Sequence, residues 1–346
     1  MKKLNITLSL LALLLLGTSC EKIFMEKQTD SDPVATFDYL WNKVDQQYSF
    51  FDLKGVDWDA VRDTYRPMVS DDISDDSLFS VLGAMLNTLN DGHTNLVAPF
   101  DVSHNDEVYR KMYENKNINS DVVVLNYLTV NYHTTGGFAH NAIRDGKIAY
   151  LRYSSFTNSI TDDDLAYLTQ RYANTQGMII DLRQNGGGNV DNVWNLMKLL
   201  PNGERQLYRT QIKNGPAHDD FSELKTVSQP RHDDALTYNH PIAILTDRGS
   251  FSATSFFSLC AKSNFYDDVT IVGDTTGGGL GLPNGGELPN GWAYRFSITR
   301  TLDLNGDNWE NGMPPDVTVI LDPAQTAAGI DNVIEAACDL LLGEWR

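Results

Sequence analysis

The stretch Pro241-Ile-Ala-Ile-Leu-Thr-Asp-Arg-Gly-Ser-Phe-Ser-Ala-Thr-Ser-Phe-Phe-Ser-Leu-Cys260 decides the fold. Ile242 to Leu245 form a short apolar run of the kind found in buried strands, and the Asp-Arg-Gly sequence at 247–249 favours a turn. Beyond Ser252, apolar residues recur at helical spacing. The stretch therefore predicts a strand, a tight turn and a helix in succession.

A residue at such a turn lies at a helix N-terminus, where backbone N–H groups are unpaired and the positive end of the helix dipole faces outward. A serine there can act as a nucleophile whose attack product those N–H groups stabilise. Serine is also a preferred N-cap, and Ser250, Ser252 and Ser255 all compete for that role. On this stretch alone, capping is the simpler interpretation.

Outward from this stretch, strand-like and helical patterns alternate from residue 147 to the C-terminus. Strands are expected at 148–153, 178–182, 242–245, 269–272, 292–301 and 317–320, and helices at 162–173, 190–200, 253–261 and 324–342. This alternation predicts an α/β catalytic domain over residues 147–346. Upstream, a 3.6-residue apolar period in three segments predicts a small helical domain over residues 35–98. Residues 99–146 are a weakly patterned connecting region with one strand expected at 122–130.

Residues 1–19 have the pattern of an export signal. Lys2 and Lys3 form a charged start, and Leu8 to Leu16 an apolar core too short to span a bilayer. The following Gly-Thr-Ser-Cys20 resembles the processing site of a bacterial lipoprotein, which implies lipidation of Cys20 and anchoring to the cell envelope, with the outer membrane as the expected location. An ordinary secretory signal is the alternative. The polar residues 20–34 are interpreted as a tether.

Composition excludes several classes of partner. The hydrophobic content of 41% is that of a globular protein, and the formal charge of −19 argues against nucleic acid or an anionic membrane surface. Cys260 and Cys338 can either pair or remain buried free thiols, and neither has metal-type spacing. Asp303, Asn305 and Asp307 resemble part of a calcium loop, but its glycine and final acidic ligand are missing, so no metal is expected.

A second motif, Asp181-Leu-Arg-Gln-Asn-Gly-Gly-Gly188, ends one predicted strand and opens a helix. Its glycines allow a sharp turn with uncovered N–H groups, which suits an anion or an oxyanion. It matches neither a phosphate loop nor a dinucleotide-binding turn. Alone, the motif is better explained as a tight structural turn.

Taken in order, Asp91-Gly-His-Thr94, the 181–188 motif and Gly249-Ser-Phe-Ser-Ala253 resemble the tail-specific (C-terminal processing) serine peptidases. The chain is most similar to the branch that includes the tricorn protease core and the interphotoreceptor retinoid-binding repeats. The similarity runs from about residue 33 to the end and includes motifs at 272–279 and 310–316. It implies a ClpP/crotonase-like catalytic domain behind a small N-terminal helical domain.

The resemblance also implies roles for individual residues. Ser252 matches the nucleophile, His93 the base and Glu310 the acid that orients the base. The N–H groups of Gly187 and Ala253 match the oxyanion hole, and Gly278 and Gly279 lie in the loop expected to bind substrate. The reaction implied is hydrolysis of a peptide or protein substrate without a metal or organic cofactor. Histidine suits the part of base because its pKa lies near neutrality, and a partner acid stabilises the imidazolium.

Three departures from the family pattern keep a rival hypothesis open. The lysine base of the main branch is replaced by Gly279, and the serine that precedes the histidine in the tricorn core is replaced by Gly92, so that Thr94 or a water would have to substitute. Residues 99–146 are too short for the usual PDZ module. The rival is a catalytically silent relative that binds peptides or apolar ligands, and hydrolysis of a non-peptide ester or amide is a third possibility. The sequence leaves the oligomeric state open.

Overall fold

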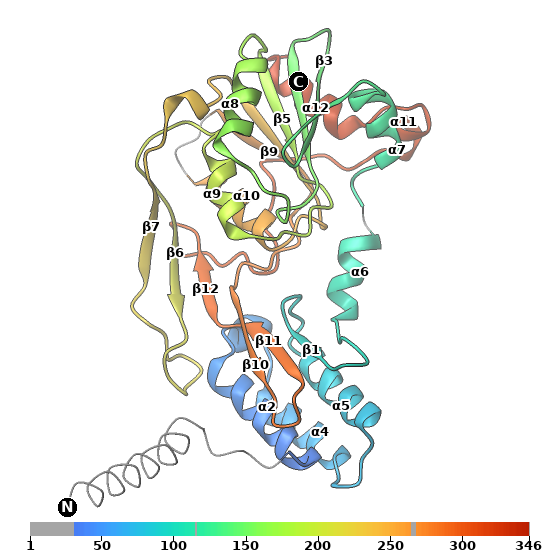
Figure 1. Ribbon diagram of the computed structural model, residues 1–346, viewed down its shortest axis with the longest axis vertical. Helices are drawn as coiled ribbons and strands as arrows, with labels where there is room; N and C mark the ends of the chain where they lie inside the picture. Colours follow the sequence, from blue (N-terminus) through green and yellow to red (C-terminus); the bar gives the residue numbers. More distant parts are fainter. Residues whose placement is uncertain (1–30, 115, 264–267, 346) are drawn as a thin grey trace, which may run out of the picture.

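The computed structural model describes residues 31–114, 116–263 and 268–345, and its centre is a seven-stranded sheet (Figure 1). In sheet order the strands are β13 (Val317–Thr318), β9 (Val269–Gly273), β8 (Ile242–Thr246), β5 (Gly177–Asp181), β4 (Ile148–Tyr153), β3 (Phe138–Ile143) and β2 (His133–Thr135). Strands β13 to β4 are parallel, and β3 and β2 continue the sheet antiparallel. Every residue of β5 and β8 is buried, as expected for parallel strands covered on both faces.

Helices cover the two faces of this sheet. On one face lie α8 (Asp162–Arg171), α9 (Val190–Met197) and α10 (Ala253–Lys262), and on the other α12 (Asn332–Leu341), preceded by α11 (Pro323–Ala327). Each face has its own apolar core. Cys260 belongs to the first core and Cys338 to the second, so the sheet separates these two buried free thiols.

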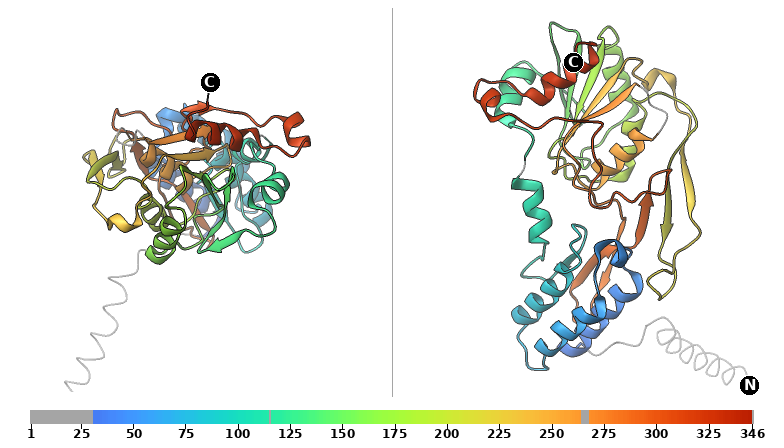
Figure 2. Two further views of the ribbon diagram at one scale, coloured as in Figure 1. Left: turned by 90° about the horizontal axis from the view of Figure 1, so that it is seen from above. Right: turned by 180° about the vertical axis from the view of Figure 1, so that it is seen from behind.

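The N-terminal part is built from helices and a small sheet (Figure 2). Its helices are α2 (Pro33–Gln47), α3 (Phe51–Lys54), α4 (Trp58–Tyr65), η1 (Arg66–Met68) and α5 (Asp75–Asn87). They pack on a three-stranded sheet of β1 (Asn95–Val97), β11 (Ala293–Ser297) and β10 (Pro283–Glu287). A segment from late in the chain therefore completes the core of the N-terminal helices.

A second small sheet lies mostly where the sequence shows no regular pattern. It contains β12 (Thr299–Leu302), β6 (Arg205–Ile212) and β7 (Lys225–Gln229), and the short helix η3 (Asp234–Leu236) follows it. Only Ile298 separates β11 from β12. The single strand expected at 292–301 is therefore two strands that belong to different sheets.

The connecting region is helical before it joins the central sheet. The strand expected at 122–130 is wrong: α7 (Ser120–Val122) and η2 (Val123–Leu128) occupy it, after the helix α6 (Asp106–Glu114). The side chain of Asn119 accepts the N–H groups of Asp121 and Val122, which starts the helix. Because β2 and β3 follow and extend the large sheet, strand pairing crosses the boundary expected at residue 147. The proposed domain limits remain a prediction.

The closing helix expected at 324–342 is interrupted. Gly329 has a φ of 81° and ends the first segment, and Asp331 then caps α12 by accepting two of its N–H groups. None of the helices in the described ranges is long and apolar enough to cross a membrane. Cys20 and the predicted export signal lie outside the described residues.

Candidate active site

Ser252 stands at the turn between β8 and α10, as the sequence predicts. Its backbone has a φ of 57° and a ψ of −119°, a conformation that L-residues rarely adopt. Its hydroxyl makes no capping hydrogen bond to α10. The turn is fixed instead by Asp247, whose carboxylate accepts the N–H groups of Gln184 and Gly249. Such strain is kept only where the surrounding structure imposes it, and it concentrates at functional sites.

His93 reaches Ser252 from the N-terminal part of the molecule. It lies in a turn after α5, in which the Asp91 carboxylate accepts the His93 N–H at 2.8 Å. Arg295 of β11 donates to the carbonyl oxygen of His93 at 3.2 Å and so ties the turn to the small sheet. His93 Nε2 lies 2.8 Å from Ser252 Oγ, although 159 positions separate the two residues in sequence. The structure therefore joins a serine hydroxyl to an imidazole at a helix N-terminus.

Phe251 explains two departures from the family pattern. Its ring lies 4.9 Å from the His93 ring, measured between centroids. A Cβ atom on Gly92 would meet the ring at 2.8 Å and one on Gly279 at 2.4 Å, closer than van der Waals contact allows. Gly279 also has a φ of 75°, which favours glycine. The ring thus occupies the space that a serine at 92 or a lysine at 279 would need.

The expected oxyanion groups lie beside Ser252 but are not equally available. Ala253 is the first residue of α10, so its N–H has no partner within the helix. Gly187 is so close that an added Cβ would lie 2.8 Å from Ser252 Cβ and 2.9 Å from the nitrogen of Ala253. The Gly187 N–H, however, donates to Asn185 Oδ1 at 3.0 Å. The Gly187 N–H can donate to an oxyanion only if it breaks or shares the hydrogen bond to Asn185.

Gly278 and Gly279 are close to the serine but use their own N–H groups internally. The Gly278 N–H donates to Ser255 Oγ, and the Gly279 N–H donates to the carbonyl oxygen of Glu310. The carbonyl oxygen of Gly278 accepts the Ser252 N–H at 2.8 Å. The two glycines therefore hold the serine turn in place, and their contact with a substrate remains a prediction.

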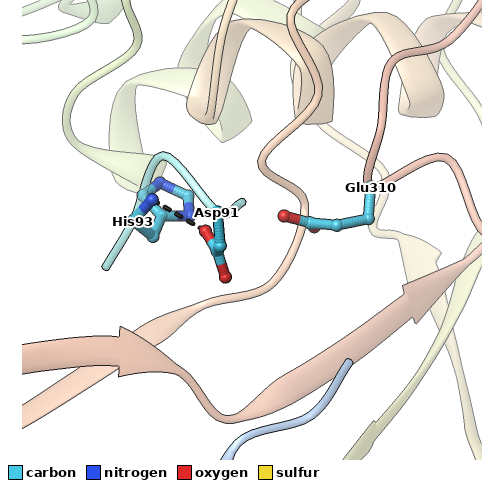
Figure 3. A group of neighbouring side chains, drawn as sticks. All are labelled: Asp91, His93 and Glu310. Carbon is cyan, nitrogen blue, oxygen red and sulfur yellow. Dashed lines mark hydrogen bonds between the residues drawn. The ribbon is translucent and has the colours of Figure 1, made fainter. Parts of the chain in front are cut away.

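Two buried carboxyl groups face His93 (Figure 3). Glu310 Oε2 accepts the N–H groups of Leu280 and Gly281, and burial, followed by the nearby charge of Asp91, raises the pKa of Glu310 to about 8. Burial lowers the pKa of His93, and the charge of Asp91 opposes this shift. His93 Nδ1 and Asp91 Oδ2 have no hydrogen-bond partner among the described residues. Asp91 is the group that the sequence analysis missed, although it stands two residues before His93.

Within the described part of the chain, Asp91, His93 and Glu310 also form a cluster of the residue types that bind metal ions. Their potential ligand atoms lie within 4.8 Å of one another. Ligands of a tetrahedral zinc lie about 3.5 Å apart, and one oxygen of each carboxylate already accepts backbone N–H groups. The trio fits an acid–base group better than a metal centre. In the partial calcium loop, Asp303 Oδ1 accepts the N–H groups of Asn305 and Asp307, which leaves that loop internally bonded.

Comparison with known proteins finds similarity to peptidases along most of the chain. The model of peptidase family S41 matches residues 147–319, which is half of the chain, and that of the tricorn protease C1 domain matches residues 33–87. The structure of a candidate peptidase from Parabacteroides merdae is 36% identical with a TM-score of 0.84, covering 90% of this chain and 98% of that one. Mature CPAF shares the fold at 13% identity and a TM-score of 0.65, covering 90% of this chain and 98% of its own.

A curated relative, the carboxy-terminal processing protease CtpB of Bacillus subtilis, is 24% identical over 180 residues. The matched region covers 51% of this chain but only 35% of CtpB. The fold and these matches define the class as tail-specific serine peptidases with a tricorn-like N-terminal part. The chain belongs to peptidase family S41. The family and the fold class predicted from the sequence are therefore confirmed.

Proposed function

We propose that this protein hydrolyses peptide bonds through an acyl-enzyme formed on Ser252. The observation that carries the proposal is the 2.8 Å contact between His93 Nε2 and Ser252 Oγ at the start of α10. A serine hydroxyl is unreactive at neutral pH until a base accepts its proton. Burial holds the pKa of His93 below its ordinary value, so the imidazole is neutral and can accept that proton.

The steps follow from the positions of these groups. Ser252 Oγ attacks the carbonyl carbon of the substrate while its proton moves to His93 Nε2. The oxyanion that forms is stabilised by the N–H of Ala253 and by the N–H of Gly187 once Asn185 releases it. The C–N bond then breaks as Nε2 returns the proton to the leaving amine. Water, activated by the same nitrogen, releases the acid product and restores Ser252.

We assign the orientation of His93 to Glu310, with Asp91 as the negatively charged group beside the ring. One carboxyl oxygen of each residue lies within 4.8 Å of a ring nitrogen of His93. Hydrogen bonds between catalytic groups are often long without substrate and tighten in the Michaelis complex. An imidazolium formed during attack would be stabilised by the negative charge of Asp91, because burial raises the pKa of Glu310 to about 8 and keeps Glu310 protonated at neutral pH.

A fluorophosphonate probe tests the proposal directly. We expect the probe to label the wild-type protein and to leave Ser252→Ala unlabelled. Ser228→Ala, at an exposed position on β7 away from the serine turn, is the matched control and should be labelled like the wild type. Absence of labelling in folded wild-type protein would reject the peptidase and favour the silent, ligand-binding relative. If the probe labels Ser252, a comparison of the rates at which casein and simple esters are hydrolysed would distinguish peptide from non-peptide substrates.

We also propose that the protein is exported and anchored to the cell envelope through Cys20. The support is the charged start, the short apolar core and the small residues before Cys20. Metabolic labelling with an alkyne fatty acid in a bacterial host should tag the wild type and not Cys20→Ala. Equal labelling of both proteins would contradict lipidation at this cysteine.

A further inference from the structure

Tyr48 brings a buried hydroxyl group to the side chains around His93. It is the residue at which α2 ends, and its N–H donates to the carbonyl oxygen of Val44 at 2.8 Å. Its side chain is 0% exposed. Burial, followed by the charges of Asp91 and Glu310, holds the pKa of Tyr48 well above its ordinary value, so the phenol lies near both carboxyl groups.

Packing fixes the ring of Tyr48. Three aromatic rings lie edge-on to it, at centroid distances of 5.9, 5.1 and 6.4 Å, and they belong to Phe50, Phe51 and Phe296. The N–H of Ser49 donates to the carbonyl oxygen of Ser297 in β11 at 3.1 Å and joins the end of α2 to this strand. Edge-to-face contacts restrict the orientation of a ring, so the hydroxyl of Tyr48 has a defined position.

Buried polar atoms without partners gather at this hydroxyl. Among the described residues, Tyr48 Oη, Asp91 Oδ2 and His93 Nδ1 are buried and make no hydrogen bond. The other oxygen of Asp91 accepts the His93 N–H, and the Asp91 residue is 1% exposed. A buried carboxylate oxygen without a donor is costly, and a buried tyrosine hydroxyl usually has a partner. The Tyr48 hydroxyl and Asp91 Oδ2 are a donor and an acceptor that can satisfy each other.

Charged groups from three other elements also act on this site. Arg295 of β11 lowers the pKa of His93, and Lys54 of α3 opposes the rise in the pKa of Glu310. Neither cation donates to Asp91: Arg295 bonds to the His93 carbonyl oxygen and Lys54 to other neutral oxygens. Glu310, which is protonated at neutral pH, is the one competing donor among these groups. One of its oxygens already accepts two backbone N–H groups.

We propose that Tyr48 is a positioning residue whose hydroxyl donates to Asp91 Oδ2 and keeps the negative charge of Asp91 beside His93. A hydrogen bond to the ionised form of a carboxyl group favours that form. The charge of Asp91 in turn raises the pKa of His93 against the effect of burial. Such hydrogen bonds are often long without substrate and tighten in the Michaelis complex. The inference rests on the proposed function of His93 as the base and adds a residue that acts on it through Asp91.

An NMR titration of His93 tests the inference without any reaction at Ser252. Histidine is labelled with carbon-13 at Cε1, and the His93 signal is assigned by its loss in His93→Gln. In Tyr48→Phe, Asp91 lacks its donor and takes up a proton more readily, so the pKa of His93 should fall by about 0.5 or more. Tyr238→Phe is the matched control. It removes a buried hydroxyl that shares a hydrogen bond with the Thr175 hydroxyl at 2.7 Å, and it should leave the pKa of His93 unchanged.

Two double variants identify the carboxyl group through which Tyr48 acts. In the Asp91→Asn background, Tyr48→Phe should cause no further change in the pKa of His93. In the Glu310→Gln background, it should lower that pKa as it does in the wild type. A tyrosine with only a packing role would leave the pKa unchanged, since phenylalanine keeps the ring. An unchanged or raised pKa in Tyr48→Phe, an effect that persists without Asp91, or one that disappears without Glu310 would overturn the inference.

A second measurement keeps Tyr48 intact, in case Tyr48→Phe fails to fold. With carbon-13 at Cζ of tyrosine, the isotope shift between H2O and D2O reports which hydroxyl protons exchange slowly. One slowly exchanging tyrosine hydroxyl of the wild type should become fast in Asp91→Asn and stay slow in Asp163→Asn, an exposed position on α8. The same set of slow hydroxyls in all three proteins would contradict the hydrogen bond. Fluorophosphonate labelling of the wild type reports separately on the peptidase, so its failure and the failure of this inference are distinguishable.

Discussion

At the scale of single residues, the protonation of His93 sets the pH at which Ser252 becomes reactive. Burial holds the pKa of His93 below 6.5, and the charge of Asp91 opposes that shift. We expect the rate of fluorophosphonate labelling to reach half its plateau below pH 6.5. In Asp91→Asn the opposing charge is gone, so this midpoint should move to still lower pH, while the side-chain oxygen can still accept the His93 N–H.

The matched control for Asp91 is Asp163→Asn on α8, whose side chain is exposed and lies in the first turn of a helix of the other part of the molecule. This variant should keep the wild-type midpoint. A midpoint that rises in Asp91→Asn, or stays where it is, would show that the charge of Asp91 does not raise the pKa of His93.

Glu310 should make the folded state less stable as the pH rises. Its folded pKa of about 8 lies above the value of about 4.3 in an unfolded chain, so between these values the native state holds a proton that the unfolded state has lost. This contribution is fully present below the lower value and is lost as the pH rises through the upper one. Urea unfolding at pH 5 and pH 8 should show a decline of up to about 1.4 kcal/mol per pH unit.

Glu310→Gln should remove that decline, because glutamine does not titrate and its oxygen can accept the N–H groups of Leu280 and Gly281. Glu223→Gln, at an exposed position, serves as the control. If wild type and Glu310→Gln lose stability equally between pH 5 and pH 8, Glu310 is already ionised in the folded protein at neutral pH.

At the scale of elements, the turn between β8 and α10 holds Ser252 at a φ of 57°. Alanine meets the same steric conflict as serine there, whereas glycine does not. Both Ser252→Gly and Ser252→Ala should abolish labelling, but Ser252→Gly should be the more stable by about 1 kcal/mol or more in urea unfolding. Equal stabilities would mean that the turn carries no strain.

The same elements show which parts of the fold local sequence patterns predict and which they do not. The apolar run at 242–245 and the helical spacing beyond Ser252 depend on local periodicity, and the structure has the strand, turn and helix in those places. The hairpin of β6 and β7 was missed because its burial is irregular, so the sequence lacks a clear two-residue alternation. The valines at 122–130 favour a strand locally, but Asn119 starts a helix whose apolar side enters the core beside α12.

At the scale of the whole molecule, the site depends on two cores that are far apart in sequence. His93 follows α5 of the N-terminal part, and Ser252 begins α10 on the central sheet. No spacing rule predicts their contact, because it depends on β11 returning to pair with β1 and on Arg295 holding the His93 carbonyl. The resemblance to the tricorn branch, rather than periodicity, is what predicted that these two residues meet.

The separation of the site between two hydrophobic cores predicts different effects for a cavity in each core. Leu82 is fully buried in the N-terminal core, and Leu168 of α8 is fully buried in the core of the central sheet. Leu→Ala at either site should therefore cost about 2–5 kcal/mol. In Leu82→Ala, hydrogen exchange should accelerate over residues 33–97 while β5 and β8 keep their protection. The labelling rate of Ser252 should then fall, because opening of the N-terminal part withdraws His93 from a serine that stays in place.

In Leu168→Ala, exchange should instead accelerate in α8 and the neighbouring strands. If both variants lost protection everywhere at the same rate, the two cores would form one cooperative unit.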